Sequence, residues 1–206
     1  MTNDSCVILK DIPTITITNS DNKPPLWKVT IGNNYKVTNL ANVSSLLWHE
    51  LRATRIHSNL NWVGFYITDP TNKNSNSLLL GPFQGKIACT SIAFGRGVCG
   101  TAALQKKTLV VPNVHLFPGH IACDSNSNSE IVVPLLLKGS NDKVIGVLDL
   151  DCEDIEAFDE SDVAGLEAIA TRTNKDTTET PVIVKIFRLA NEETLVIEIG
   201  STRDLK

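Results

Sequence analysis

Three of the five cysteines lie within one stretch of the chain, residues 88–130, among small, polar and turn-forming residues. They are Cys89, Cys99 and Cys123, whereas a thiol that serves packing is usually surrounded by Val, Leu and Ile. An odd number of cysteines also leaves one thiol outside any set of intramolecular disulfides. The pattern favours thiol chemistry, in which one thiolate attacks and a second thiol closes a disulfide.

Three acidic residues accompany these thiols: Glu130, Asp149 and Asp151. The two aspartates are two positions apart on a predicted strand, so they share a face, together with Ile145 and Val147. Their charges repel each other, and we expect at least one of them to have a raised pKa. Such a pair can bind an ammonium group or supply a proton. The alternative is that both acids end the strand at solvent.

The cysteines also allow a zinc site, with His115 or His120 as a fourth ligand. Structural zinc sites usually contain paired ligands two to four residues apart, and only His120 and Cys123 have that spacing. The segment Gly95–Gly100 matches the dinucleotide fingerprint G-x-G-x-x-G. A Rossmann fold would need a surrounding βαβ unit and a later acidic residue. We interpret these glycines instead as a turn into a helix.

That helix should begin near Val98 and end by Lys107, which places Cys99 in its first turn. The positive end of the helix dipole would lower the pKa of this thiol. Cys152 lies between two acidic residues, whose charges disfavour a thiolate. Cys6 is near the N-terminus and is expected to be inert.

The remaining pattern predicts an α/β (α+β) domain built on an antiparallel sheet. Trp62 and Tyr66 alternate with Val63 and Phe65, so the two polar-tipped aromatics share one face of a strand and suit a pocket wall. The long irregular segment 112–129 is typical of a functional loop. We expect helices over 38–55, 98–107 and from Asp159, and strands over 61–68, 78–80, 108–111, 131–137 and 143–151.

The net charge and the distribution of apolar residues argue against several classes of function. The 206 residues carry a net charge of −4, which argues against nucleic-acid binding. No apolar run approaches the length of about 20 residues that spans a bilayer, so we expect no membrane partner. The N-terminus has no apolar core of a signal peptide, which predicts a cytoplasmic protein, with the nucleus as an alternative.

Five blocks of the sequence resemble the free methionine-(R)-sulfoxide reductases, a catalytic branch of the GAF domains. The resemblance covers residues 39–169. The blocks are N-W-V-G-F-Y, G-P-F-Q-G-K-I-A-C, G-R-G-V-C-G-T-A, F-P-G-H-I-A-C-D-S-N-S-N-S-E-I-V-V-P and G-V-L-D-L-D.

The resemblance implies a GAF fold, with about six antiparallel strands flanked by helices and a small enclosed pocket. It implies reduction of free methionine (R)-sulfoxide with thioredoxin as reductant and no metal or other cofactor, and it allows a homodimer. By position, Cys123 matches the attacking cysteine, Cys89 the main resolving cysteine and Cys99 a third thiol. The positions that match substrate-binding residues are Trp62, Tyr66, Glu130, Asp149 and Asp151.

We expect three regions: an extension over 1–37, the catalytic GAF domain over 38–174, and a second extension over 175–206. Alternating residues at 14–18 and 27–31 suggest strands in the first extension, and 182–187 with 194–199 suggest a hairpin in the second. The alternative function is a non-catalytic GAF module that binds a small molecule or senses redox state. Such a module gives no reason for three thiols in turn-rich segments.

Overall fold

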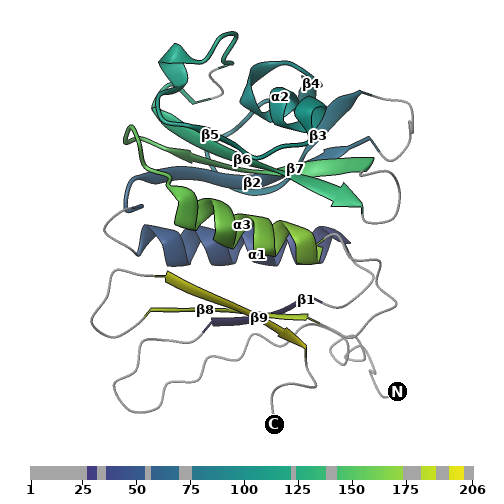
Figure 1. Cartoon of the computed structure of the whole chain (residues 1–206), viewed down its shortest axis with the longest axis vertical. Coiled ribbons are helices and arrows are strands. Elements are labelled where there is room, and N and C mark those ends of the chain that lie inside the picture. Colours follow the sequence, from purple (N-terminus) through teal and green to yellow (C-terminus); the bar gives the residue numbers. More distant parts are fainter. Residues whose placement is uncertain are drawn as a thin grey trace, which may run out of the picture.

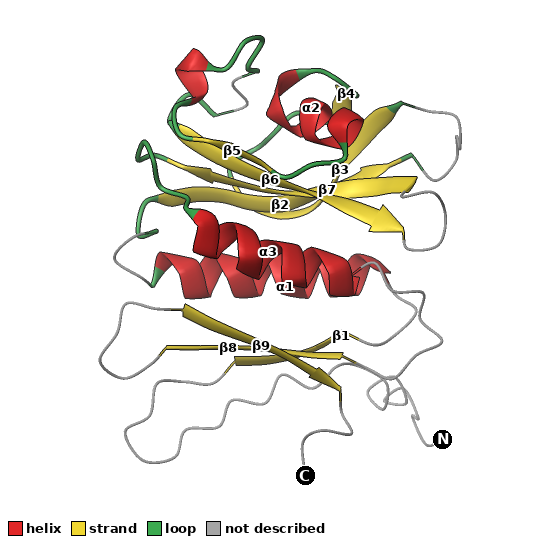
Figure 2. Cartoon of the chain, viewed as in Figure 1, coloured by secondary structure: helices red, strands yellow, loops and turns green. Residues whose placement is uncertain are grey.

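The computed structural model describes residues 27–31, 36–53, 57–69, 76–121, 124–137, 143–173, 182–188 and 195–201. Figure 2 shows helices and strands in alternating layers. The elements are β1 (Trp27–Ile31), α1 (Lys36–Arg52), β2 (Leu60–Thr68), β3 (Ser77–Gly85), β4 (Ser91–Ala93), α2 (Gly97–Gln105), β5 (Leu109–Val111), η2 (Val114–Leu116), β6 (Ser129–Leu137), β7 (Lys143–Cys152), α3 (Glu160–Thr173), β8 (Val182–Arg188) and β9 (Leu195–Ser201).

The central feature is a six-stranded sheet with the order β4-β3-β2-β7-β6-β5. All its neighbouring strands are antiparallel, so the expected antiparallel α+β fold is confirmed and a Rossmann sheet is excluded. Helices α1 and α3 cover one face of the sheet, and α2 with the long loop covers the other (Figure 1). The predicted order of helix, hairpin, short helix, strand pair and final helix is also correct.

Strand alternation divides the apolar residues of the sheet between two clusters. Val63 and Phe65 of β2 join α1 and α3 in one cluster, and Trp62 and Tyr66 lie in the other, on the side of α2. The prediction for Ile145 is wrong, because this side chain packs with the first cluster. The register between β6 and β7 skips from Gly146 to Val144, and such a bulge turns the extra residue to the opposite face.

The start of α3 agrees with the prediction, whereas the start of α1 does not. Asp159 accepts hydrogen bonds from the backbone N–H groups of Ser161 and Asp162, and its own N–H donates to the Asp162 carboxylate at 2.9 Å. This reciprocal arrangement is a capping box, and it confirms the predicted start of α3. Helix α1 covers Lys36–Arg52, so it begins two residues before the predicted start at residue 38.

A second, smaller sheet has the order β1-β8-β9. It lies beyond α1 and α3, on the opposite side of these helices from the six-stranded sheet (Figure 1). The predicted C-terminal hairpin is confirmed, since β8 and β9 pair antiparallel, and β1 pairs with β8. The alternating segment 14–18 lies outside the described residues.

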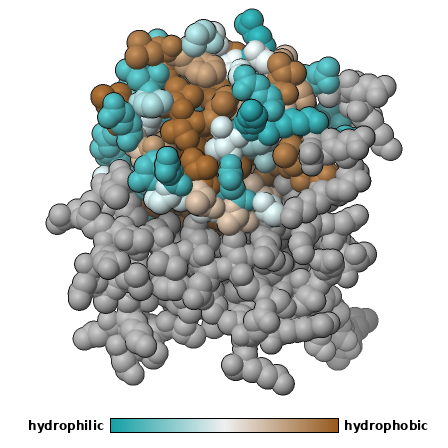
Figure 3. Space-filling view, viewed as in Figure 1, coloured by the Kyte–Doolittle hydropathy of each residue, from teal (hydrophilic) through white to brown (hydrophobic). Residues whose placement is uncertain are grey.

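The surface of the described residues carries both apolar and polar side chains. Figure 3 shows apolar side chains gathered in the middle of one face, with polar groups around them. A hollow on the molecule lies between β5, β6 and α3 and is lined by Val110, Val133 and Leu136 among others. None of the described helices combines the length and the apolar character that a bilayer crossing requires.

Candidate active site

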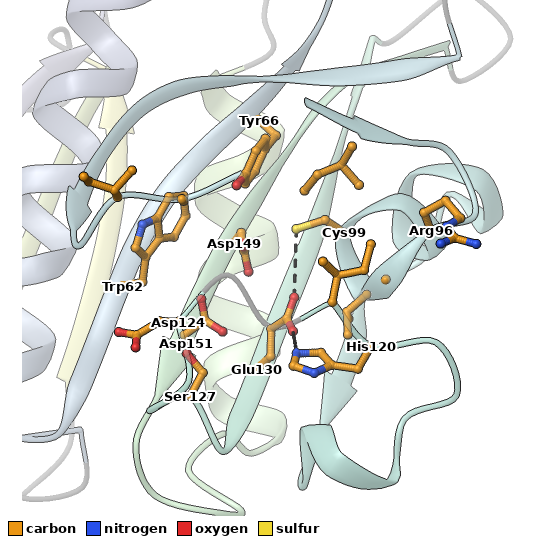
Figure 4. Close-up of a pocket in the computed structure, with 16 residues that line it drawn as sticks. Trp62, Tyr66, Arg96, Cys99, His120, Asp124, Ser127, Glu130, Asp149 and Asp151 are labelled. Atoms are coloured by element: carbon orange, nitrogen blue, oxygen red, sulfur yellow. Dashed lines mark hydrogen bonds and ion pairs between the residues drawn. The ribbon is translucent and has the colours of Figure 1, made fainter. Parts of the chain in front are cut away.

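A small cavity lies between the six-stranded sheet, α2 and the loop that precedes β6 (Figure 4). Its volume is about 40 Å³, which is room for a small ligand rather than for a folded peptide segment. The lining side chains come from β2, β6, β7, the start of α2 and the flanking loops. They include all five candidate substrate-binding residues, namely Trp62, Tyr66, Glu130, Asp149 and Asp151.

The register of the sheet brings the three acids together. Asp151 of β7 lies opposite both Trp62 of β2 and Glu130 of β6, so these three residues form one row across the sheet. Asp149 lies two positions along β7, opposite Gly64. Because side chains at i and i+2 share a face, both aspartates point into the same cavity as Glu130. The alternative in which the aspartates end a strand at solvent is excluded for Asp149, which is 6% exposed.

Trp62 forms an aromatic wall of the cavity. Its ring stacks on Tyr66, with centroids 5.8 Å apart, and on Phe83, with centroids 5.3 Å apart. The indole Nε1–H donates to the carbonyl of Lys86 at 3.2 Å. The ring passes over Gly64, where an added Cβ would lie 2.5 Å from Trp62 Cη2. Because Gly64 has no side chain, the indole ring of Trp62 can occupy this position.

Gly64→Ala should lower kcat/KM for the substrate by about tenfold or more, because overpacking forces the indole ring to move. The effect should be measured by steady-state kinetics, together with the thermal midpoint to show that the variant is folded. A folded Gly64→Ala protein with unchanged kcat/KM would show that Trp62 does not position the substrate.

Burial controls the ionisation of the acids. Desolvation raises the pKa of Asp149 to about 7. Desolvation, followed by the charges of Asp149 and Asp151, raises the pKa of Glu130 well above its usual range. Desolvation and the charge of Asp149 do the same for the half-buried Asp151. The prediction that at least one acid has a raised pKa is confirmed, and Glu130 can hold a proton at neutral pH.

Cys99 lies in the first turn of α2, as predicted, but its environment reverses the expected ionisation. The side chain is 4% exposed, and its thiol donates to Glu130 Oε1 at 3.9 Å. Burial, with the charges of Asp149 and Glu130, raises the pKa of Cys99 well above its usual range. The expectation from the helix dipole is therefore wrong, because desolvation and nearby carboxylates outweigh it.

The loop before β6 is held to the sheet by polar contacts. His120 Nε2 lies 3.7 Å from Glu130 Oε2. Asn61 donates from its amide to Ser127 Oγ at 3.0 Å and to Asp124 Oδ2 at 3.3 Å. Asp124 also pairs with Lys86 at 3.1 Å. These contacts close one side of the cavity, and they place His120 beside the buried acid.

The other cysteines occupy different environments. Cys89 is disulfide-bonded, whereas Cys99 and Cys152 are free thiols. Cys123 lies outside the described residues. Cys152 is buried in the cluster under the sheet, away from the cavity, and burial raises the pKa of its thiol. This direction agrees with the prediction that Cys152 is a poor nucleophile.

Several cavity residues were not among the candidates from sequence. Arg96 precedes α2, and Asp124 and Ser127 follow Cys123 in the loop. The proximity of Asp124 and Ser127 to a candidate nucleophile was a usable signal. Arg96 gave no comparable signal, since it stands between two glycines of a turn. Among the described residues that line the cavity, Arg96 and His120 are the only basic side chains.

Comparison with known proteins finds relatives across most of this domain. The GAF domain family model matches residues 42–175. The chain is 52% identical over 140 residues to free methionine-R-sulfoxide reductase of Saccharomyces cerevisiae, covering 68% of this chain and 74% of the relative. It is 45% identical over 136 residues to free methionine-R-sulfoxide reductase of Escherichia coli, covering 66% of this chain and 74% of the relative.

A solved structure gives the same result. The X-ray structure of free methionine-R-sulfoxide reductase from Neisseria meningitidis in complex with its substrate superimposes with a TM-score of 0.62 and 44% identity. The superposition covers 70% of this chain and 79% of that chain. Since both the fold and the sequence agree over this length, the chain belongs to the free methionine-R-sulfoxide reductase family of GAF-domain proteins.

Proposed function

We propose that this protein reduces free methionine (R)-sulfoxide to methionine through a cysteine sulfenic acid and an intramolecular disulfide that thioredoxin reduces. The observation that carries the proposal is the cavity in which three acids face an aromatic wall beside a thiol. Relatives that bear the name of this reductase are 45–52% identical to the chain. The residues that line the cavity indicate which chemical groups of the substrate it can bind.

Free methionine sulfoxide offers an ammonium group, a polar sulfoxide and an apolar methyl group. Asp149 and Asp151 of β7 provide a negative surface for the ammonium group. The face of Trp62 provides an apolar surface for the methyl group. Burial raises the pKa of Glu130, and the protonated carboxyl can donate a proton to the sulfoxide oxygen. His120, at 3.7 Å from Glu130, can pass a proton to it from solvent.

The proposed reaction has three steps. The Cys123 thiolate attacks the sulfoxide sulfur while Glu130 gives a proton to the oxygen; the oxygen passes to Cys123 as a sulfenic acid and methionine leaves. The Cys89 thiol then condenses with the sulfenic acid, releases water and forms a disulfide. Thioredoxin transfers two electrons and two protons to this disulfide and restores both thiols.

The state of the cysteines supports this division of roles. Cys89 is disulfide-bonded while Cys99, which touches Glu130, is free. In the proposed cycle, Cys123 is the cysteine that forms the catalytic disulfide with Cys89. Cys99 remains a third thiol beside the acids, and its high pKa makes it a poor first nucleophile.

The substrate preference provides the main test. With thioredoxin, thioredoxin reductase and NADPH, the protein should turn over free methionine (R)-sulfoxide, with the (S) epimer and peptide-bound sulfoxide nearly inert. The reason is that a peptide lacks the free ammonium group that Asp149 and Asp151 can bind. NADPH oxidation and chromatographic detection of methionine measure this preference. Comparable rates on a sulfoxide-containing peptide would refute it.

We assign the catalytic domain to residues 38–174, with extensions over 1–37 and 175–206. All described residues that line the cavity fall between Trp62 and Asp151. Removal of residues 1–25 and 176–206 should therefore preserve methionine release in a single turnover, although the lost strands β8 and β9 could lower stability. A shortened protein that is folded by circular dichroism but inactive would contradict this assignment.

A further inference from the structure

Three side chains with metal-ligating atoms meet at the end of the cavity. Ligand atoms of Cys99, Glu130 and Asp149 all lie within 4.8 Å of one another. The Cys99 Sγ to Glu130 Oε1 distance is 3.9 Å. On the other side of the same carboxylate, His120 Nε2 lies 3.7 Å from Glu130 Oε2. Figure 4 shows Cys99 and His120 on opposite sides of Glu130, with Asp149 opposite the acid.

These separations are close to those of a tetrahedral metal centre. With metal–ligand bonds of about 2.0–2.3 Å, ligand atoms lie about 3.3–3.8 Å apart. Contraction by at most about 1–1.5 Å would bring these three ligand atoms to that geometry. The donor set combines one sulfur and two carboxylates. Sulfur disfavours Mg²⁺ and Ca²⁺, which take oxygen ligands, and the set as a whole suits Zn²⁺.

A separate observation concerns one carboxylate oxygen of the cluster, on Asp149. Asp149 is 6% exposed and lines the cavity. Its Oδ1 atom is buried without a hydrogen-bond donor among the described residues. A buried carboxylate oxygen without a donor is costly. It therefore points to a ligand that brings positive charge or a hydrogen-bond donor into the cavity.

We propose that Cys99, Glu130 and Asp149 bind Zn²⁺ in the reduced protein, and that this metal ion excludes the substrate. On binding, the thiol proton of Cys99 is released to solvent and its sulfur becomes a metal ligand. Zn²⁺ then occupies Asp149, which would otherwise help to hold the substrate ammonium group. We infer metal binding from the geometry of the cluster, whereas the inference that the metal inhibits the reaction also rests on the proposed function.

The test uses Co²⁺ as a spectroscopic probe for the reduced full-length protein. Titration with Co²⁺ should give a thiolate-to-cobalt charge-transfer absorption, which Zn²⁺ should then remove by displacement. Cys99→Ser should abolish this absorption. Asp149→Asn should keep the absorption and weaken Co²⁺ binding by at least about tenfold. Cys152→Ser is the matched control, since it removes a buried thiol outside the cavity and should bind Co²⁺ like the parent.

Three outcomes would overturn the proposal. The first is the absence of charge-transfer absorption in the parent protein. The second is persistence of the absorption in a folded Cys99→Ser protein, which would assign the sulfur ligand to another cysteine. The third is unchanged Co²⁺ affinity in Asp149→Asn, which would exclude the buried carboxylate as a ligand.

Inhibition is measured separately, as methionine released by the reduced protein without thioredoxin. Zn²⁺ at ten times its Kd should slow release about tenfold at low substrate concentration, and excess sulfoxide should relieve the inhibition. Release in the presence of a chelator together with no Co²⁺ absorption would overturn the metal site and leave the proposed function intact. Co²⁺ absorption in a protein that never releases methionine would overturn the proposed function and leave the metal site intact.

Discussion

Cys123→Ser should abolish methionine release from free methionine (R)-sulfoxide, even for a single turnover without reductant. A serine hydroxyl is a weak nucleophile at neutral pH, and it cannot accept oxygen as a sulfenic acid. We expect a rate at least about 1,000-fold below that of the parent protein. Cys99 is not expected to replace Cys123, because burial and two neighbouring carboxylates keep its thiol protonated.

The experiment compares methionine released per subunit across a cysteine series. Cys89→Ser should release about one methionine and then stop as a sulfenic acid, unless Cys99 resolves it. Cys152→Ser is a matched control, since that thiol is buried away from the cavity, and it should behave like the parent, as should Cys6→Ser. A full burst from Cys123→Ser, together with no burst from Cys99→Ser, would assign Cys99 as the nucleophile.

Glu130→Gln should lower the rate of the first turnover by about 100- to 10,000-fold, which is the usual contribution of a general acid. The substitution preserves size and the ability to donate a hydrogen bond, but it removes the transferable proton. Desolvation and the charges of Asp149 and Asp151 hold the pKa of Glu130 high. The raised pKa favours the protonated carboxyl that a general acid requires, and the loss should appear in kcat more than in KM.

Rapid-mixing measurement of methionine formation, with protein in excess, tests this role without interference from the reductant. Glu167→Gln is a suitable control, since Glu167 is an exposed residue of α3 and lies outside the active-site cavity. A rate for Glu130→Gln within about threefold of the control would exclude Glu130 as the proton donor.

Strand periodicity was sufficient to place several site residues on the correct face. Trp62 and Tyr66, like Asp149 and Asp151, alternate with apolar residues that pack under the sheet, and all four line the cavity. The position of Glu130 opposite Asp151 depends on the β6–β7 register. That register follows from a bulge that the alternation of β7 alone did not reveal, and it also explains the error at Ile145.

Long-range contacts explain what the sequence could not predict. The ionisation of Cys99 was predicted from its own helix, but burial raises its pKa, and so do carboxylates that belong to β6 and β7. Pairing of β1 with β8 joins segments from opposite ends of the chain. The contacts of Asn61 with Asp124 and Ser127 likewise join β2 to a distant loop. Local patterns carry no information about such pairs.

The stoichiometry of one turnover tests the central claim most directly. Fully reduced protein is mixed with excess free methionine (R)-sulfoxide without thioredoxin, and both methionine and remaining thiols are counted. We predict about one methionine per subunit and the loss of two thiols, with a disulfide between Cys89 and Cys123 identified by mass spectrometry. No methionine from the (R) epimer, or methionine released with no loss of thiols, would contradict the account.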